Sequence, residues 1–329
     1  MTDRNPPHSA LCALRIGSRG SQLALWQAHH IADKLRARGH EVSIEIIRTT
    51  GDAMQHLTFA QVGVQTGSKG IFTKEIEEAL LEKRIDLAVH SLKDLPTDLA
   101  DPFTIAAIPV RADASDVFVS VKYETFASLP QGARVGTSSL RRQSQLRAQR
   151  RDLEYVEFRG NVDTRLRKLA EGQVEAIILA AAGLDRLERT EDLRERFPSL
   201  ILCPAPGQGA LAIEARAEDT ATLEALAFLD DAATRFAVTA ERATLAALGG
   251  GCQVPIGVHC WPISNGFDIL GVVASPDGAS ILRAELDCRH DESPEALGKK
   301  LAAHLVEQGA GPILALIESP PLQTGVTTP

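Results

Sequence analysis

The chain has 329 residues, of which 44% are hydrophobic and 24% charged, and its net charge at pH 7 is −8. This profile is typical of a soluble protein with two or three domains. The acidic balance and an aromatic content of 4% argue against a general nucleic-acid-binding surface. The polar N-terminus lacks the apolar core of a signal peptide, and no segment reaches the roughly 20 apolar residues of a membrane span.

The five cysteines favour a reducing, cytoplasmic compartment. Their number is odd and no pair has Cys-x-x-Cys spacing, so neither a disulfide framework nor a zinc site is expected. The adjacent pair His29 and His30 falls in a helical pattern, where neighbouring side chains point in different directions. We therefore expect no metal site.

Short apolar runs alternate with helical patterns over the first two-thirds of the chain. Up to the first proline-rich segment, the pattern predicts strands at 14–16, 42–47, 87–89 and 103–108, a helix at 21–38 and a second helix capped by Thr73. A second block repeats it, with strands at 116–119, 134–136, 153–158 and 176–180 and helices at 139–150 and 161–171. This alternation indicates two similar α/β domains with largely parallel sheets. Proline and glycine cluster at 109–113 and 204–209, which we interpret as hinges.

The pattern changes after residue 231. A long helix is predicted at 232–247, followed by strands at 256–260, 270–274 and 281–287 and a final helix at 293–308. Asn265-Gly266 and Asp277-Gly278 are hairpin signals between those strands. The segment therefore reads as an α+β module, and the segments 1–10 and 319–329 are expected to be disordered tails.

One thiol stands on a glycine loop straight after the long helix. In Gly249-Gly250-Gly251-Cys252, the glycines let a bulky group approach the main chain. A structural cysteine is more often a small hydrophobe inside a strand or helix. The loop therefore suggests a thiol that carries a group, although the segment alone is equally compatible with a simple turn.

Arginine is concentrated in one region of this acidic chain. Nine arginines lie between Arg134 and Arg167, beside only four acidic residues. The run 136–139, Gly-Thr-Ser-Ser, places hydroxyls and backbone N–H groups at a strand-to-helix turn before Arg141 and Arg142, which is a natural anion site. The alternative is a solvated helix face, which we favour for Arg147, Arg150 and Arg151.

Polar residues follow the buried strand that ends near Val89. The run 90–96 contains Lys93 and Asp94, and ligands bind at the carboxyl ends of strands in open α/β sheets. Asp94 could stabilise a developing cation, and the alternative is an ordinary strand-exit turn ended by Pro96. The glycine-rich span 48–70 has no clear period and lacks the P-loop pattern, so we interpret it as a long mobile loop that could act as a lid.

Taken together, these segments resemble the porphobilinogen deaminase (hydroxymethylbilane synthase) family. Seven blocks match in order between about residues 14 and 317, among them the runs 15–19, 88–96, 135–143, 159–162, 180–184, 206–210 and 250–255. The resemblance implies two periplasmic-binding-protein-like α/β domains that flank a cleft, plus a smaller C-terminal α+β domain. The implied boundaries are 11–109 with 210–229, then 110–209, then 230–318.

The resemblance also implies a chemistry. Cys252 would carry a dipyrromethane cofactor through a thioether bond, and four porphobilinogen molecules would be added with loss of ammonia before the linear tetrapyrrole is hydrolysed off. Asp94 holds the position of the family's catalytic aspartate, where a fixed carboxylate stabilises an azafulvenium cation. Because each pyrrole carries an acetate and a propionate, the growing chain gathers negative charge, which would account for the arginines.

Residue by residue, the resemblance carries over three sets of roles. The catalytic set is Asp94, Lys93, Arg19, Arg159 and Arg165. The cofactor-binding set is Cys252, Lys93, Asp94, Ser91, Thr137, Ser139, Arg141, Arg142 and Arg165. The substrate-binding set is Arg19, Ser21, Arg159, Arg186, Lys69, Gln208 and Arg216.

One departure and two alternatives remain at this point. The loop between Gln61 and Lys69 is longer than is usual in the family, which has a lysine where Gln61 falls. A non-catalytic, two-lobed binding protein for a small carboxylate would share the lobes and arginines but not explain Cys252. A nucleic-acid binder is disfavoured by the net charge. A monomer without metal, membrane or nucleic-acid partner is expected.

Overall fold

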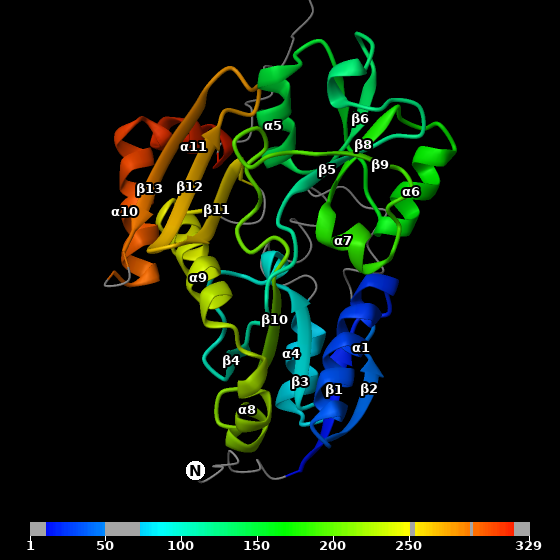
Figure 1. The fold of residues 1–329 in the computed structure, drawn as a ribbon, viewed down its shortest axis with the longest axis vertical. Coiled ribbons are helices and arrows are strands. Elements are labelled where there is room, and N and C mark those ends of the chain that lie inside the picture. The colour runs from blue at the N-terminus through cyan, green and yellow to red at the C-terminus, as the bar shows by residue number, and fades with distance from the viewer. Residues whose placement is uncertain (1–10, 50–72, 251–253, 290–291, 319–329) are drawn as a thin grey trace, which may run out of the picture.

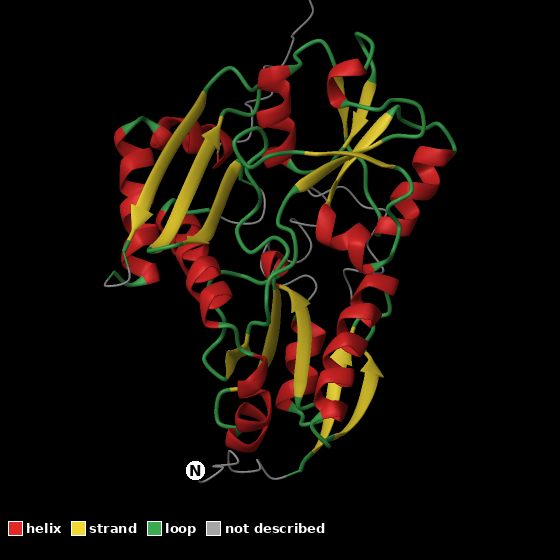
Figure 2. Cartoon of the chain, viewed as in Figure 1, coloured by secondary structure: helices red, strands yellow, loops and turns green. Residues whose placement is uncertain are grey.

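The computed structural model of the chain describes residues 11–49, 73–250, 254–289 and 292–318. The described residues form three β-sheets, of which one lies in the lower part of the view, one at the upper right and one at the upper left (Figure 1, Figure 2). The proposed tails, nearly all of the proposed lid, Lys69 and Cys252 lie outside the described residues. In the described part, no helix is both long and apolar enough to cross a membrane.

The lower sheet and its helices form what we call the first lobe. Its strands, in spatial order, are β2 (Glu41–Ile46), β1 (Ala13–Ser18), β3 (Leu87–Ser91), β10 (Leu211–Arg216) and β4 (Phe103–Ala107). Its helices are α1 (Gln22–Ala37), α4 (Lys74–Leu81) and α8 (Thr220–Leu226), with the 3₁₀ turns η1 (Leu92–Asp94) and η3 (Ala227–Leu229). Alternation along β3 buries Leu87 and Val89 in the core with α1, and Ala88 in the core with α4.

The upper right sheet forms the second lobe in the same way. Its strands, in spatial order, are β7 (Glu154–Val156), β6 (Arg134–Gly136), β8 (Ala176–Ala180), β5 (Asp116–Val119) and β9 (Leu193–Arg196). Its helices are α5 (Leu140–Gln149), α6 (Val162–Ala170) and α7 (Ala181–Arg186), with the 3₁₀ turn η2 (Phe126–Ser128). Phe118 packs into one core of this sheet, while Val117 and Val119 pack into the other.

The expectation of largely parallel sheets is wrong. In each lobe three strands pair in parallel, β2, β1 and β3 in one and β7, β6 and β8 in the other. The fourth strand, β10 or β5, runs antiparallel to both of its neighbours. Each of these strands follows a crossing from the other lobe, so each enters its sheet in the opposite direction. The α/β class itself and the two-lobed plan are confirmed.

A three-stranded antiparallel sheet forms the third domain, as the hairpin signals predicted. Its strands are β11 (Ile256–Ile263), β12 (Gly266–Ala274) and β13 (Ile281–Cys288). Helices α9 (Ala232–Ala247), α10 (Pro294–Glu307) and α11 (Ala310–Glu318) accompany it, and its core includes Ala240, Leu301 and Ile313 from these helices. The last helix, α11, was not predicted.

One buried carboxylate ties the two lobe crossings to the third domain. Glu241 of α9 is fully buried and accepts two hydrogen bonds from Arg111, at 2.6 and 3.1 Å, and one each from the backbone N–H of Gly207 and Cys260, at 2.6 and 2.8 Å. Arg111 also donates to the carbonyl of Gln208 at 2.8 Å. With β10 in the first sheet, this arrangement supports the domain boundaries 11–109 with 210–229, 110–209 and 230–318, which we retain as a proposal.

Candidate active site

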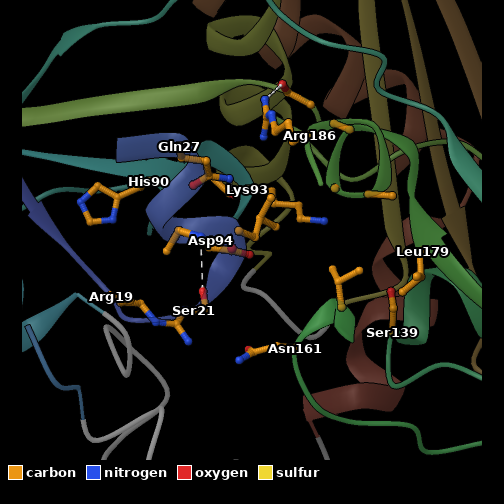
Figure 3. Close-up of a pocket in the computed structure, with 18 of the residues that line it drawn as sticks. Arg19, Ser21, Gln27, His90, Lys93, Asp94, Ser139, Asn161, Leu179 and Arg186 are labelled. Atoms are coloured by element: carbon orange, nitrogen blue, oxygen red, sulfur yellow. Dashed lines mark hydrogen bonds between the residues drawn. The ribbon is translucent and has the colours of Figure 1, made fainter. Parts of the chain in front are cut away.

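A cavity of about 630 Å³ lies between the two lobes, at the carboxyl ends of their parallel strands. Figure 3 shows Arg19, Ser21 and Asp94 on one side and Ser139 and Leu179 on the other. The turns that follow β1, β3, β6, β7 and β8 all contribute lining residues. This edge is the expected ligand site of an open α/β sheet.

The first-lobe wall is built on the beginning of α1 and the end of β3. Ser21 is the N-cap of α1, and its hydroxyl accepts from the backbone N–H of Ala24 at 3.3 Å. Gln27, one turn further, donates to the hydroxyl of Ser91 at 2.9 Å. Arg19 lies in the turn before the cap. The wall therefore presents a helix N-terminus, which favours anions, beside an arginine.

Lys93 and Asp94 sit together on η1, the single turn that follows β3. The Lys93 ammonium donates to the side-chain carbonyl of Gln208 at 3.3 Å, and in Figure 3 its side chain extends between the two walls. Burial, and after it the charge of Arg142, lower the pKa of Lys93 to about 8, against the opposite effect of Asp94. An amine with this pKa can bind and release a proton near neutral pH.

The second-lobe wall is built on the helices α5, α6 and α7 and their arginines. Ser139 caps α5 by accepting from the backbone N–H of Arg142 at 3.4 Å. Arg165 donates to the carbonyl of Gly160 at 2.7 Å, and burial lowers the pKa of its guanidinium to about 10. Arg186 of α7 donates to the carbonyl of Gly209 at 2.7 Å and its pKa is lowered to about 10, again by burial.

The charge balance of the cavity is one-sided. Among its described lining residues the cations are Arg19, Lys93, Arg142, Arg159, Arg165 and Arg186. The same set contains one carboxylate, Asp94. A chain with a net charge of −8 thus keeps a strongly cationic interior site. Such a cavity suits a small molecule with several carboxylates and a single place where positive charge develops.

The structure brings most of the predicted site residues together. Those that line the cavity are Arg19, Ser21, Ser91, Lys93, Asp94, Ser139, Arg142, Arg159, Arg165 and Arg186. Two more, Lys69 and Cys252, lie outside the described residues. The shared location of the ten lining residues supports their predicted roles.

Four predicted residues do not line the cavity. Arg141 is buried, and it donates to Asp116 and to the carbonyl of Cys203 at 2.6 Å each. Arg216 is buried on β10, where it donates to the carbonyls of Leu80 and Ile85. Gln208 and Thr137 lie behind the wall, and neither is exposed to the cavity. The positions of Arg141 and Arg216 therefore favour structural roles, because their donors are directed at backbone and carboxylate groups away from the cavity.

Several lining residues were given no role from the sequence. Gln27 and His90 belong to matching motifs, and His90 pairs with the buried Glu214 at 2.9 Å. Asn161 precedes α6. Ile317 of α11 also lines the cavity, on the helix face that carries the buried Ala310 and Ile313. The spacing 310, 313, 317 is helical, but no sequence signal shows that the last turn reaches the site.

The fold and the cavity define a two-lobed α/β protein with an interlobe site for a polyanionic small molecule. Two family profiles match the chain: "Porphobilinogen deaminase, dipyromethane cofactor binding domain" over residues 14–224, and "Porphobilinogen deaminase, C-terminal domain" over residues 235–307. The chain belongs to the porphobilinogen deaminase family.

Curated relatives agree along nearly the whole length. Porphobilinogen deaminase of Desulforudis audaxviator is 51% identical over 306 residues, which cover 92% of this chain and 97% of that protein. The enzyme of Brevibacillus brevis is 48% identical, with 92% and 96% covered. The resemblance seen in the sequence is thus confirmed, and the protein is a transferase of tetrapyrrole biosynthesis with porphobilinogen deaminase activity.

Solved structures of binding proteins superpose on part of this chain at low identity. An ABC transporter periplasmic substrate-binding protein from Coxiella burnetii superposes with a TM-score of 0.40 at 14% identity, covering 68% of this chain and 94% of that one. A nutrient-binding protein from Burkholderia cenocepacia bound to methionine gives 0.39 at 13% identity, with 65% and 91% covered.

The cavity fits the cofactor that the family profile names. A dipyrromethane carries four carboxylates on two pyrroles, and the wall offers Arg142, Arg165 and the hydroxyls of Ser91 and Ser139 as donors. When bound, this group supplies the nucleophilic pyrrole carbon to which the first substrate is joined. These four side chains, with Asp94, would hold it.

Proposed function

We propose that Asp94 is the catalytic carboxylate of the deaminase reaction. As the aminomethyl carbon–nitrogen bond of porphobilinogen breaks, ammonia leaves with the electron pair and the remaining pyrrole becomes an azafulvenium cation. A fixed carboxylate near the pyrrole N–H stabilises that cation. The observation that carries this proposal is that Asp94 is the one carboxylate among the described residues lining a cavity with six cations.

The cationic side chains bind the substrate's acetate and propionate groups in this proposal. Arg19, Ser21, Arg159 and Arg186 would hold the incoming porphobilinogen, with Arg19, Arg159 and Arg165 also assisting catalysis. Arginine pairs with a carboxylate through two parallel hydrogen bonds, which fixes orientation as well as charge. Arg186 is already fixed by its bond to Gly209, which supports a positioned rather than a mobile contact.

In this proposal Lys93 transfers protons between the reacting groups beside Asp94. When the new carbon–carbon bond forms, the attacking pyrrole carbon loses its proton to restore the aromatic ring, and the ammonia that left can take up a proton. The Lys93 pKa of about 8 suits a group that passes a proton between such partners. Repetition over four porphobilinogen units, on a primer held by a thioether to Cys252, would give hydroxymethylbilane after hydrolysis.

The setting of the reaction also remains a proposal. We propose a monomer, as the family resemblance implies. Among the described residues, Cys12, Cys203, Cys260 and Cys288 form no disulfide, which supports a reducing cytoplasm. Light scattering after size-exclusion chromatography measures the oligomeric state.

The test is the substitution Asp94→Asn, which keeps the shape of the side chain and removes its charge. We expect kcat for ammonia release to fall at least about 100-fold, the usual effect of losing an electrostatic stabiliser, with an unchanged melting temperature. Asp98→Asn, at an exposed residue outside the cavity, is the matched control. Activity of Asp94→Asn within tenfold of wild type would remove Asp94 from the mechanism. The intact mass of a Cys252→Ser variant, compared with wild type, tests the attachment residue.

A further inference from the structure

A second buried carboxylate, Asp116, stands one contact behind the cavity wall. It begins β5, the strand that enters the second lobe after the first crossing, and its side chain is fully buried. It accepts from Arg141 at 2.6 Å, from two nitrogens of Arg142 at 2.7 and 2.9 Å, and from the side-chain amide of Gln208 at 2.9 Å. Neither the sequence patterns nor the family resemblance gave this residue a role.

The charge of Asp116 is fixed by those partners. Burial by itself would raise the pKa of this carboxyl group, but the guanidiniums of Arg141 and Arg142 lower it well below its usual range. A buried carboxylate that lost these partners would carry a large desolvation cost. Asp116 is therefore a permanent anion within a cluster of buried cations.

Two of the four links lead into the cavity. Arg142 lines the cavity, and its Nη1 donates to the carbonyl of Ile178 at 3.0 Å. Gln208 turns its amide nitrogen to Asp116 and its carbonyl oxygen to the Lys93 ammonium, at 3.3 Å. Asp116 thus sets the direction of one guanidinium directly and of one ammonium through a relay.

We infer that Asp116 is a positioning residue of the deaminase reaction, which holds Arg142 and, through Gln208, Lys93 in place at the cavity wall. Asp116 reaches no substrate itself. The inference rests on the proposed roles of Lys93 and Arg142. Without the buried carboxylate of Asp116, Arg142 and Lys93 would no longer be held in the positions that the reaction needs.

The electrostatics give this role a signature that a structural role lacks. The positive charges of Arg142 and Arg141 lower the pKa of Lys93, whereas Asp94 and Asp116 raise it. These are the charged groups that act on Lys93 from η1, β5 and α5. Removing the charge of Asp116 would leave both arginines uncompensated, so Lys93 would lose its proton at a lower pH.

The chain contains a matched control, Asp86 in the first lobe. Asp86 is likewise buried between two arginines, accepting from Arg15 at 2.8 and 3.0 Å and from Arg216 at 3.4 Å. None of these three residues lines the cavity. Asp86→Asn therefore reproduces the stability cost of opening such a cluster without touching Lys93.

The experiment compares Asp116→Asn with Asp86→Asn in the purified full-length protein. Acetic anhydride labels neutral amines, and peptide mass spectrometry gives the pH of half-maximal labelling of Lys93. We expect this pH to fall by about one unit in Asp116→Asn and to stay at the wild-type value in Asp86→Asn. We also expect kcat/KM for porphobilinogen to fall more than tenfold in Asp116→Asn and less than threefold in Asp86→Asn.

Two outcomes would overturn the inference: a Lys93 labelling curve in Asp116→Asn that superposes on wild type, or equal losses of kcat/KM in the two variants. If Asp116→Asn does not fold, Gln208→Met cuts the relay while leaving both arginine pairs and the charge of Asp116; we then expect kcat/KM to fall more than tenfold because Lys93 loses the acceptor that positions it, and a loss below threefold would overturn the inference. Labelling requires no turnover, so a failure of the proposed Asp94 mechanism would leave this test intact.

Discussion

Lys93 shows how a cationic cavity affects a single residue. Its pKa of about 8 lies below the ordinary 10.5 because the side chain is enclosed and faces Arg142. Each unit of such a shift corresponds to about 1.4 kcal/mol between the two protonation states. The side chain proposed for proton transfer therefore lowers the stability of the folded protein at neutral pH.

That cost should depend on pH with a definite sign. Below pH 8 Lys93 is protonated in both the folded and the unfolded chain, and the folded state bears the full cost. Between about pH 8 and 10.5 the unfolded chain retains a proton that the folded chain has lost, so rising pH favours folding. We expect Lys93→Met to exceed wild type in free energy of unfolding by up to about 3 kcal/mol at pH 7 and by less at pH 10.

Urea unfolding at several pH values measures this difference. Lys299→Met, at an exposed residue of α10, controls for the removal of a surface lysine. A difference between Lys93→Met and wild type that stays constant from pH 7 to 10 would contradict the assigned pKa.

At the residue scale the sequence identified the site but not every orientation. Arg141 and Arg142 are neighbours in one motif, and both were expected to bind the cofactor. Only Arg142 lines the cavity, while Arg141 points to Asp116 and Cys203. Asp116 follows a lobe crossing and pairs with both arginines, and local sequence does not show which of the two also reaches the cavity. Arg216 does not line the cavity either, and its pairing with Asp86, 130 residues away along the chain, could not be seen from local sequence.

Helix α9 connects the lobe crossings to the third domain through Glu241. The carboxylate receives four hydrogen bonds from three separate segments, and its burial leaves no water to replace a lost donor. Removing one partner of a buried ion pair commonly costs about 3–5 kcal/mol. We expect Glu241→Gln to lower the free energy of unfolding by about 3 kcal/mol or more.

Denaturant unfolding of Glu241→Gln tests this value. Glu224→Gln, at an exposed residue of α8, should remain within about 0.5 kcal/mol of wild type. A loss in Glu241→Gln no greater than in this control would mean that Arg111 finds another partner.

Helices could be predicted from the sequence where the hydrophobic periodicity and an N-cap residue indicated the same boundary. Helices α1, α5 and α10 begin after Ser21, Ser139 and Ser293, whose hydroxyls cap them as serine at this position predicts. Strands β9 and β10 and helix α7 were not predicted. Strand directions were misread because a strand's direction depends on which lobe it comes from, and hydrophobic alternation carries no such information.

At the scale of the whole molecule the two lobes are joined by paired crossings. The backbone N–H of Ala112 donates to the carbonyl of Gly209 at 3.2 Å, so the outgoing and returning segments contact each other. Gly209 has a φ of +86°, and a Cβ there would meet the carbonyl oxygen of Ala112 at 2.6 Å. The close approach of the two crossings therefore requires glycine.

We expect Gly209→Ala to spread the crossings, lower the melting temperature and reduce kcat at least tenfold, because the lobes then no longer meet in register. Gly132→Ala is the control, with a φ of +78° and nothing within 4 Å of the added Cβ. It isolates the backbone strain, about 1–2 kcal/mol, from the steric clash. Small-angle scattering compares the radius of gyration, and an unchanged Gly209→Ala profile with full activity would contradict the expectation.

The two-lobe plan with a separate α+β module was predictable, because the alternation of apolar runs changes character after residue 231. How the parts are joined was not, since it depends on contacts such as Glu241 with Gly207, 34 residues apart along the chain.

The four hydrogen bonds accepted by Glu241 limit how the two lobes and the third domain can move relative to one another. Three bodies joined by flexible links could in general move independently of one another. Here the Glu241 carboxylate accepts hydrogen bonds from both lobe crossings, at Arg111 and Gly207, and from the first strand of the third domain, at Cys260. A rotation of one lobe relative to the other would therefore have its axis at the two crossings beside Glu241. Because the third domain is hydrogen-bonded at the same point, its distance from that axis would stay constant while the cavity widened or narrowed.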